Sequence, residues 1–458
     1  MEREDKMSNS ATKDMTQGSP VKLIIGFSLP LMVGVLFQQF YNIVDTIIVG
    51  RCLGVEALAG VGATGSINFL IIGFCMGICA GCSIPIAQRF GAKDYVDMRR
   101  FLANCVWLGL FLATVITVVS SVLCRKILVW MNTPSDIFDY SFTYISIIFL
   151  GIPATFLYNI LSGVMRSLGN SKAPLVFLLI SSFTNIGLDF LCILVFQMGV
   201  MGAAVATVSS QLFSGLLCLL YMIKAIPILH IQREEWGLSM VHIKILCGMG
   251  LPMGLQYSIT AIGAVVLQTA LNTLGSIAVA AFATGSKISL FFSCGFDALG
   301  TTMATYGGQN VGAKKLDRLS KGLLDCILIG CIYSVVSAVV LNIFSETLIG
   351  FFAEDISPEL LANAKQFLLI NSVFYIALAL VNIVRFMIQG MGFSNLAILA
   401  GVLEMIARTI VAFFLVPRIG FVGACFASPL AWIMADAFLI PAYIAVKKKL
   451  ERDILAYS

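Results

Sequence analysis

The chain has 458 residues, of which 59% are hydrophobic and only 12% are charged. Soluble globular domains contain about 25% charged residues, and so few charges cannot shield this much apolar surface from water. The composition therefore excludes a cytosolic enzyme, a secreted domain and a disordered protein, and it indicates a chain that lies in lipid. The formal charge of +5 comes from basic residues scattered in short groups, so no nucleic-acid surface is expected.

Residues 1–21 are polar, and we expect them to form a flexible cytoplasmic segment, since they carry no signal-peptide cleavage pattern. Beyond them, twelve apolar segments are long enough to cross a bilayer, which needs about 20 residues. The predicted spans are 23–49, 56–85, 101–124, 138–165, 173–197, 200–226, 244–272, 277–305, 320–345, 362–390, 395–416 and 421–446. The pattern predicts an all-α, multi-pass membrane protein.

Basic residues are distributed unequally between the two sides of these spans. With both termini placed inside, 22 Lys and Arg residues fall on the cytoplasmic side, Arg385 among them, and 5 fall on the other side. Cytoplasmic loops of membrane proteins carry an excess of positive charge. We therefore expect a protein of the cell membrane with twelve spans and both termini in the cytoplasm.

The chain repeats itself at a nearly constant spacing of a little under half its length. Four short strings recur in the same order: SLP (28–30) as GLP (250–252), ATGS (63–66) at 283–286, FGAK (90–93) as VGAK (311–314), and GVMGA (199–203) as GFVGA (420–424). Parallel repeats of this kind are a transporter architecture, with the substrate bound near the membrane midplane. The repeat predicts two six-helix lobes at 22–227 and 243–447, a cytoplasmic linker at 228–242 and a cytoplasmic tail at 448–458.

Two acidic residues lie deep within spans of the first half, where an ionisable side chain is costly and hence a functional candidate. Each ends a polar stripe at helical spacing: Gln38, Asn42 and Asp45 in the first span, and Ser181, Asn185 and Asp189 in the fifth. Thr207 in the sixth span adds a hydroxyl group. The two acids could be purely structural, but no basic residue lies deep in this half to neutralise them. We interpret them as a site for a small cation or for protons.

The second half carries charges of both signs within its spans: Lys287, Asp297, Glu404, Arg408 and Asp436. Glu404 and Arg408 are one helical turn apart, and pairing lowers the cost of burying both charges. We therefore expect a structural ion pair there. Lys287 and Asp297 are too far apart in sequence to meet on one helix. The sequence assigns no role to these buried charges.

Other chemistry finds little support. The thirteen cysteines lie mostly in apolar runs, which is typical of core residues rather than of a disulfide framework. Cys75, Cys79 and Cys82 share a helix face, but no fourth ligand is evident, so a metal centre is not expected there. Gly-Lys-Ser and Gly-Lys-Thr are absent, which argues against ATP as the energy source. We expect neither an enzyme nor a cofactor, apart from a coupling ion.

In order and over residues 22–447, the chain resembles the MATE (multidrug and toxic compound extrusion) family. The resemblance rests on LPLMVGVLFQQFYNIVDTIIVG (29–50), MRSLGNSKAPL (165–175), TNIGLDF (184–190), GVMGAAVATVSSQ (199–211), MGFSNLAILAGVLEMIAR (391–408) and GFVGACFASPLAW (420–432). It implies a V-shaped antiporter that exports cationic or amphipathic organic compounds while Na⁺ or H⁺ enters. Membrane lipid is the expected surrounding, and a monomer is the expected state.

The resemblance also implies where coupling occurs. The DinF-like branch uses an acid on the first span, an Asn and an Asp four residues apart on the fifth, and a Thr on the sixth. The matching residues here are Asp45, Asn185, Asp189 and Thr207, with Na⁺ as one candidate ion. Gln38, Asn42 and Asn159 would line the substrate cavity. The NorM-like branch places coupling acids on spans 7 and 10, whereas span 7 here offers Gln256 and Gln268, so the DinF-like branch is favoured.

Two other functions agree less well with these features of the sequence. A lipid-linked oligosaccharide flippase of the wider superfamily often needs a strongly cationic cavity and additional spans, whereas this chain has twelve spans and an acidic first half. A non-transporting membrane sensor or assembly protein would normally carry a recognition domain outside the membrane. No connection between the predicted spans exceeds about twenty residues, which disfavours that class.

Overall fold

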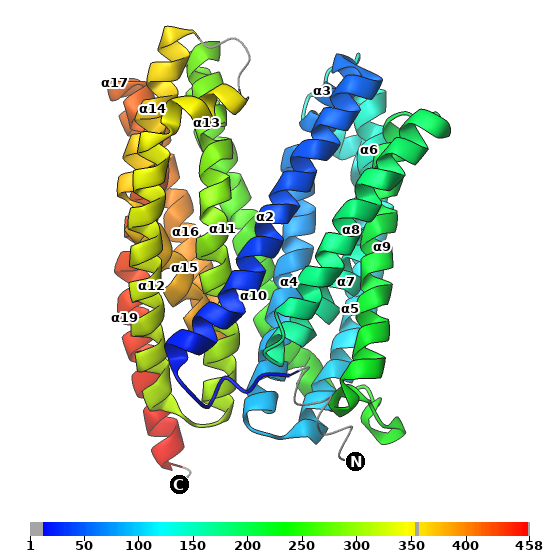
Figure 1. Ribbon diagram of the computed structural model, residues 1–458, viewed down its shortest axis with the longest axis vertical. Helices are drawn as coiled ribbons and strands as arrows, with labels where there is room; N and C mark the ends of the chain where they lie inside the picture. Colours follow the sequence, from blue (N-terminus) through cyan, green and yellow to red (C-terminus); the bar gives the residue numbers. More distant parts are fainter. Residues whose placement is uncertain (1–11, 353–356, 457–458) are drawn as a thin grey trace. The chain divides into compact units, whose positions relative to one another are not determined.

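The structure is a computed structural model that describes residues 12–352 and 357–456. Residues 1–11 of the predicted N-terminal segment and 457–458 of the predicted tail lie outside the described residues. Every regular element within the described part of the chain is helical. Ten helices are long and apolar enough to cross a membrane, and two pairs of helices, each bent at a short break, raise the number to twelve. The predicted twelve-span, all-α architecture is confirmed (Figure 1).

The structure divides into two compact units. Unit 1 comprises Met1–Asp14 and Val33–Gly254. Its helices are the second part of α2 (Pro20–Leu53), α3 (Val55–Ala63), α4 (Gly65–Gly91), α5 (Tyr95–Trp130), α6 (Phe138–Leu150), α7 (Ile152–Ser167), α8 (Lys172–Phe190), η1 (Leu191–Val195) and α9 (Val200–Ala225). After η2 (Pro227–Leu229) and η3 (Arg233–Glu235), the unit ends within α10 (Met240–Asn272). Helix α7 packs against both α4 and α9 around the unit's apolar core.

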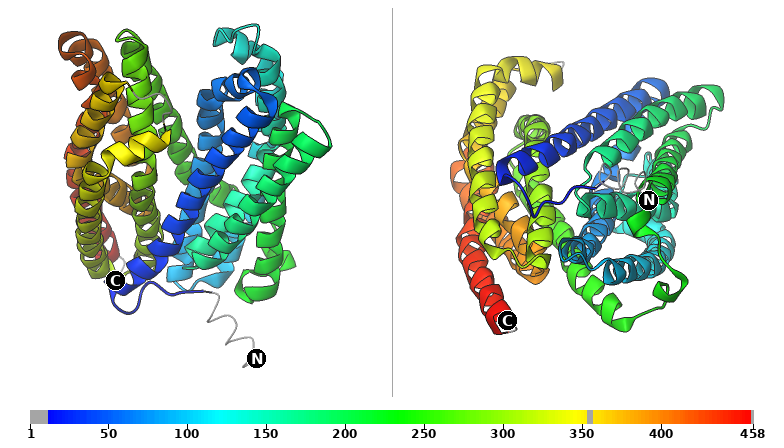
Figure 2. Two further views of the ribbon diagram at one scale, coloured as in Figure 1. Left: turned by 45° about the horizontal axis from the view of Figure 1, so that its top comes forward. Right: turned by 60° about the horizontal axis from the view of Figure 1, so that its bottom comes forward.

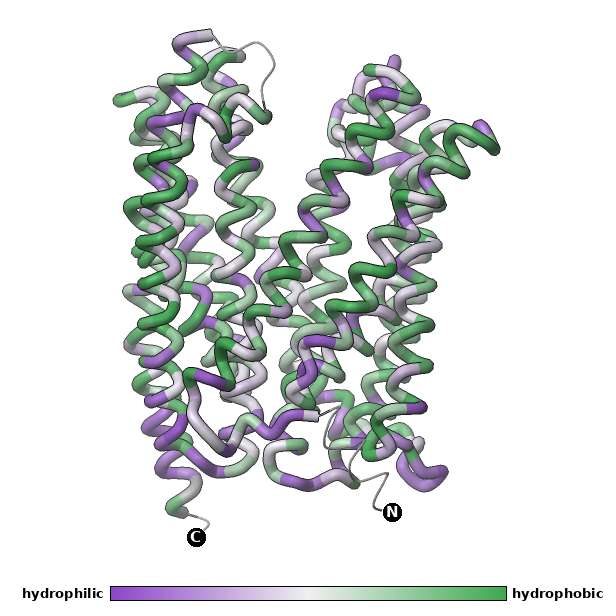
Figure 3. The backbone as a smooth tube through the Cα atoms, in the orientation of Figure 1, coloured by the Kyte–Doolittle hydropathy of each residue, from purple (hydrophilic) through white to green (hydrophobic). Residues whose placement is uncertain are grey.

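Unit 2 comprises Met15–Met32 and Leu255–Ser458. After the second part of α10 come α11 (Ser276–Gly312), α12 (Leu316–Ile343), α13 (Ser345–Phe352), α14 (Pro358–Val373), α15 (Tyr375–Gly390), α16 (Ser394–Ile410), η4 (Val411–Leu415), α17 (Val416–Ile419), α18 (Phe421–Cys425) and α19 (Ala427–Ala456). Helix α15 packs between α11, α12 and α19 (Figure 2). Helix α19 continues through most of the predicted C-terminal tail. In both units the hydrophilic residues gather toward the helix ends (Figure 3).

The internal repeat reappears in the backbone of the two units. A π-helical turn follows α8 at Leu191–Val195, and another follows α16 at Val411–Leu415. The left-handed residues also recur in pairs, each pair at the spacing of the sequence repeat: Gly54 and Gly275, Lys93 and Lys314, Gly199 and Gly420. The bent pairs correspond as well, with angles of 47° between α6 and α7 and 50° between α14 and α15. The repeat therefore specifies two copies of one helical topology.

Two long helices each contribute to both units. Residues 20–32 of α2 pack with unit 2 and the rest of α2 with unit 1, whereas α10 does the reverse, changing unit after Gly254. Each change falls shortly after a proline, Pro30 in α2 and Pro252 in α10. A proline inside a helix removes a backbone hydrogen bond and permits a kink. The packing units therefore exchange the first turns of these helices, whereas the predicted lobe boundaries followed the sequence repeat.

The segment before α2 differs from the flexible lead that the sequence predicts. Met15 and Thr16 are buried within unit 2, with 0% and 4% of their surface exposed. Gln309 Oε1 accepts a hydrogen bond from Met15 N at 2.8 Å, and Asn310 Nδ2 donates to Met15 O at 3.3 Å. Lys315 Nζ donates to Thr16 O at 2.9 Å. Side chains at the end of α11 and just beyond it thus order the residues before α2 and position its start.

The predicted linker at 228–242 is also folded, and it lies against α5 within unit 1. Arg99 forms a bidentate ion pair with Glu235, with Nη2–Oε1 and Nε–Oε2 distances of 2.7 Å. The hydrogen bond from Arg99 lowers the pKa of the Glu235 carboxyl below its ordinary value. Asn104 Oδ1 accepts from Ser239 N at 2.8 Å. These contacts tie the start of α10 to unit 1.

Candidate functional site

The two acids predicted in the first half come together within unit 1. Asp45 lies on the second part of α2 and Asp189 at the end of α8, and the two carboxyl groups interact with each other. Asp189 is completely buried and Asn185, one turn earlier, is 1% exposed. Sequence spacing placed each acid on a polar stripe, and the fold brings the ends of the two stripes together.

The polar atoms of this cluster lack hydrogen-bond partners among the described residues. Asp45 Oδ1, both carboxylate oxygens of Asp189 and both polar atoms of the Asn185 amide are buried without a partner. Buried polar groups are nearly always hydrogen-bonded, and an unpaired one costs several kcal/mol in hydrocarbon. A bound proton or small cation would satisfy these oxygens. Such orphaned carboxylate and amide oxygens fit an ion-binding site better than a structural role.

The helices that carry the cluster are held by hydroxyl groups and end irregularly. Ser181 Oγ donates to Ser210 O at 2.9 Å and Ser214 Oγ to Phe177 O at 3.0 Å, so α8 and α9 are pinned together. The π-helical turn η1 begins just after Asp189, at Leu191. π-Helical turns occur frequently at functional sites because they widen one turn of the helix. Asp189 therefore lies where regular α-helical geometry ends.

Two tyrosines that were not predicted as site residues also belong to this environment. Tyr41, on α2, and Tyr144, on α6, each interact electrostatically with Asp45 and Asp189. Tyr144 is 7% exposed. Tyr41 precedes Asp45 by one helical turn, a spacing that could have identified it. Tyr144 comes from a different span without a polar stripe, so only the fold identifies it.

The other predicted residues of the first half have no recorded hydrogen bond to Asp45 or Asp189 among the described residues. The Thr207 hydroxyl donates to Ala203 O at 3.0 Å within α9 and is half-buried. Gln38 is half-buried and interacts with Tyr41 on α2, and Asn42 is exposed. Asn159 is half-buried and donates to Thr155 O at 2.8 Å within α7. The cluster is therefore Asp45, Asn185 and Asp189, and the roles of the other residues stay predictions.

The second half buries the predicted ion pair of Glu404 and Arg408, together with a second partner of Glu404 that was not predicted. Arg385 of α15 donates from Nη2 to Glu404 Oε1 of α16, and the side chains are 7% and 5% exposed. Arg408 lies 3.9 Å from the other Glu404 oxygen and donates to Thr260 O at 3.5 Å. The assignment of Arg385 to the cytoplasmic loops was wrong. Because Arg385 neutralises a buried acid, it is retained inside the unit.

The remaining charges of the second half separate into buried and exposed ones. Asp436 on α19 is 7% exposed and its Oδ1 has no hydrogen-bond partner among the described residues. Lys287 and Asp297, both on α11, were predicted to be buried but are exposed. Asp297 nevertheless interacts electrostatically with the buried Arg385. Asp436 is thus a buried acid with an oxygen that lacks a direct partner.

The first parts of α2 and α10 correspond to each other in the repeat, but they pack differently against their units. In unit 1, α10 touches α4 backbone to backbone, since a Cβ atom added to Gly81 would lie 2.5 Å from Met249 O and one added to Gly77 would lie 2.6 Å from Met253 O. Glycines at the interface allow membrane helices to approach this closely. Gly250 and Gly254 of α10 are the facing residues.

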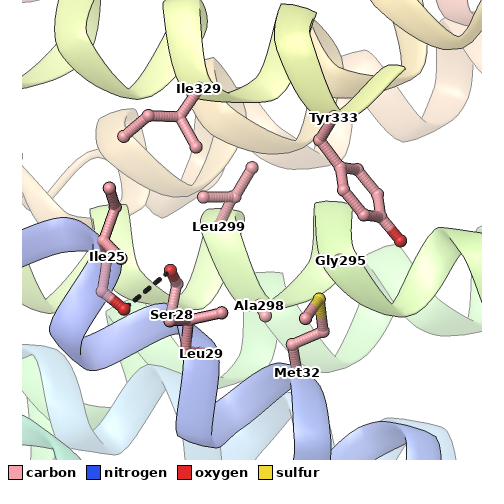
Figure 4. A pocket seen from close by; sticks show the side chains of 9 residues that line it. All are labelled: Ile25, Ser28, Leu29, Met32, Gly295, Ala298, Leu299, Ile329 and Tyr333. Atoms are coloured by element: carbon pink, nitrogen blue, oxygen red, sulfur yellow. Dashed lines mark hydrogen bonds between the residues drawn. The ribbon is translucent and has the colours of Figure 1, made fainter. Parts of the chain in front are cut away.

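In unit 2 the corresponding seat of α2 contains a cavity of about 240 Å³ (Figure 4). Ser28 and Met32 of α2, the repeat counterparts of Gly250 and Gly254, line it together with Gly295 and Tyr333. Leu29 at the same seat is 49% exposed. The first part of α2 is therefore packed loosely and has room to move, whereas the first part of α10 is tightly held.

Comparison with known proteins agrees with these features. The MatE family model matches residues 30–191 and 252–414, so one pattern occurs twice, once in each half of the chain. The probable multidrug resistance protein YpnP of Bacillus subtilis is 28% identical over 364 residues, which cover 79% of this chain and 80% of that protein. The FAD transporter of Shewanella oneidensis is 23% identical over 373 residues, covering 79% and 80% of the two chains. The probable multidrug resistance protein NorM of Thermotoga maritima is 24% identical over 421 residues, covering 88% of each chain.

Solved structures share the whole fold. An outward-facing multidrug resistance transporter of the MATE family matches with a TM-score of 0.86 at 23% identity, over 95% of this chain and 98% of that chain. A transporter from Pyrococcus furiosus, described as having a binding pocket of reverse polarity, matches with a TM-score of 0.87 at 22% identity, over 96% and 97%. At such identities the likeness establishes the fold alone. The choice between the DinF-like and NorM-like branches stays a prediction.

Proposed function

Since the chain belongs to the MatE family of transporters, we propose that it is a multidrug efflux antiporter that exports cationic or amphipathic organic compounds in exchange for Na⁺ or H⁺. The chain is a multi-pass membrane transporter and not an enzyme. Relatives named as multidrug resistance or multidrug export proteins support the substrate class. The excess of Lys and Arg on one side of the spans supports cytoplasmic termini. We further propose that the transporter acts as a monomer in direct contact with lipid.

The coupling ion binds, in this proposal, at Asp45, Asn185 and Asp189, with Thr207 as an additional ligand. The observation that carries it is the set of buried oxygens on the two carboxylates that have no donor among the described residues. Two adjacent carboxylates repel each other when both are ionised, and a proton or Na⁺ between them removes that repulsion. Carboxylate, amide and hydroxyl oxygens suit either ion.

Movement of α2 would connect ion binding to export. An ion at Asp45 and Asp189 neutralises the second part of α2, while the first part, before Pro30, lies against the cavity of unit 2. A ligand shifts a conformational equilibrium only when it binds the two states with different affinity. Ion binding therefore favours a rearranged α2 and weakens the binding of the organic compound, which leaves on the outer side. On the cytoplasmic side, the next substrate competes the ion off.

The lipid-linked oligosaccharide flippase considered above is not favoured. The curated relatives include proteins named for multidrug resistance or export. The buried charge of the first unit is acidic, which suits organic cations rather than pyrophosphate-linked sugars.

The test uses purified protein in liposomes, with a fluorescent organic cation followed while Na⁺ and pH gradients are imposed separately. Movement of the organic cation driven by only one of the two gradients would identify the coupling ion. We expect Asp189→Asn to abolish gradient-driven movement while the protein stays folded, because the amide cannot release a proton or balance a cation's charge. Asp136→Asn, at an exposed loop position, is the matched control and should transport normally. Undiminished transport by Asp189→Asn would refute coupling at this cluster.

A further inference from the structure

Unit 2 buries a second set of ionisable side chains, on three helices that pack together. Arg385 lies on α15, Glu404 and Arg408 on α16, and Asp436 on α19, and α19 packs against both α15 and α16. Arg385, Glu404 and Asp436 are all buried. None of these residues belongs to the cluster of Asp45 and Asp189 in unit 1.

The two buried acids of this set differ in their hydrogen-bond and ion-pair partners. Glu404 receives the Nη2 group of Arg385 on one oxygen and has Arg408 3.9 Å from the other. Asp436 Oδ1, by contrast, is buried without a hydrogen-bond partner among the described residues. Arg385 Nε is likewise buried and without a partner there. An unfilled acceptor and an unfilled donor thus lie in one buried network, and the two residues interact electrostatically.

The surroundings of Asp436 decide what it can bind. The helices packed against α19 carry these titratable residues: Arg385 on α15, Glu404 and Arg408 on α16, Glu359 and Lys365 on α14, and Cys425 on α18. Arg385 also interacts electrostatically with Asp297 on α11 and Tyr257 on α10. Lys365 forms an ion pair with Glu346. The neighbouring guanidinium groups would repel a metal cation, and no group of three or more His, Cys, Asp or Glu able to hold a metal occurs among the described residues. A proton is the remaining ligand that neutralises a buried carboxylate.

We propose that Asp436 is a proton-binding site in unit 2, separate from the cluster at Asp45 and Asp189, with Arg385 as the group that stabilises its deprotonated form. A proton from water binds one oxygen of the carboxylate and gives a neutral acid. When the proton leaves, the positive charge of the Arg385 guanidinium stabilises the carboxylate, while Nη2 keeps its bond to Glu404. Arg385 therefore links the protonation state of α19 to α15 and α16.

This site goes beyond the proposed function, since it concerns the second half of the chain and does not depend on which ion binds in the first. It predicts that the transporter responds to pH even where Na⁺ is the coupling ion. The experiment must therefore silence the first cluster, so that a failure of one idea is not mistaken for a failure of the other.

The test is infrared difference spectroscopy of the purified Asp45→Asn/Asp189→Asn protein, titrated from about pH 9 to about pH 5, the range that buried carboxyl groups can reach. We expect a carboxylic-acid C=O band that grows as the pH falls and shifts in D₂O. Adding Asp436→Asn should reduce the amplitude of this band by the contribution of one carboxyl group, whereas Asp317→Asn, at an exposed position of α12, should leave it unchanged. A band of undiminished amplitude in Asp436→Asn overturns the proposal.

Two further measurements keep the proposal testable if Asp436→Asn does not fold. Labelling the side-chain carboxyl of aspartate with ¹³C in the same background should shift the band, and an unshifted band would belong to a glutamate and overturn the proposal. Arg385→Gln should make the band persist to higher pH, because the deprotonated form loses the positive charge that stabilises it. A merely structural Arg385 would leave the titration where it was.

Discussion

The close contact between α4 and α10 gives a prediction whose size follows from the geometry. In Gly81→Ala, the new Cβ would lie 2.5 Å from the backbone oxygen of Met249, whereas ordinary contacts begin at 3.4 Å. The difference of 0.9 Å (3.4 minus 2.5) must be met by separating two helix backbones, because no flexible side chain can yield. Overpacking of this kind costs about 1–3 kcal/mol.

The assay is the melting temperature of the purified protein in detergent. For a cooperative unit of about 150–250 residues, each kcal/mol lowers Tm by about 2–4 °C, so we expect a decrease of roughly 2–12 °C. Gly248→Ala is the matched control, since it lies in α10 and its Cβ would meet nothing within 4 Å. Removing a helical glycine there should leave Tm unchanged or raise it by a few degrees. Equal Tm values for the two variants would refute the argument that α4 and α10 are held backbone to backbone.

Three other outcomes follow from single contacts. Glu235→Gln should lower Tm at neutral pH. Because Arg99 lowers the pKa of Glu235, the ion pair stabilises the fold above the ordinary carboxyl pKa of 4.5, and the Tm difference from wild type should close as the pH falls below it. A Tm difference that does not depend on pH would contradict this. Arg385→Met should cost about 3–5 kcal/mol by leaving Glu404 buried without its main donor, and the added change Glu404→Leu should recover most of the loss; an uncorrected loss would argue against the pair. Asn310→Ala removes the hydrogen bond to the backbone of residue 15, and limited trypsin digestion should then cleave the segment before α2 faster; an unchanged digestion rate would show that this bond does not order the segment.

Much of the fold was readable from the chain because lipid imposes simple requirements. A span needs about 20 apolar residues whatever its neighbours are, and the twelve predicted segments correspond to the ten long helices and the two bent pairs. The repeat was readable for a similar reason, since the left-handed positions at Gly54 and Gly275 or at Gly199 and Gly420 demand particular residues. The acids of the first half stood out because charges inside spans are rare.

Tertiary packing alone decided which charges are buried and which residues meet. Arg385 looked like a loop residue because the positive-inside rule counts charges without knowing their partners, yet its bond to Glu404 from a neighbouring helix keeps it inside unit 2. Lys287 and Asp297 looked buried because they lie in a span, but the rotation of α11 exposes both. Tyr144 joins Asp45 and Asp189 across three helices.

Composition and periodicity thus determined that this chain crosses a membrane twelve times as two copies of one topology, and they marked the acids of its first half. Those properties depend on single segments and on the solvent around them. The exchange of the first turns of α2 and α10 between the packing units, and the unpaired Asp436 oxygen in the network of Arg385, depend on contacts between residues far apart in the chain. Such contacts have no local signal, because a residue's partners are chosen by the packing of whole helices.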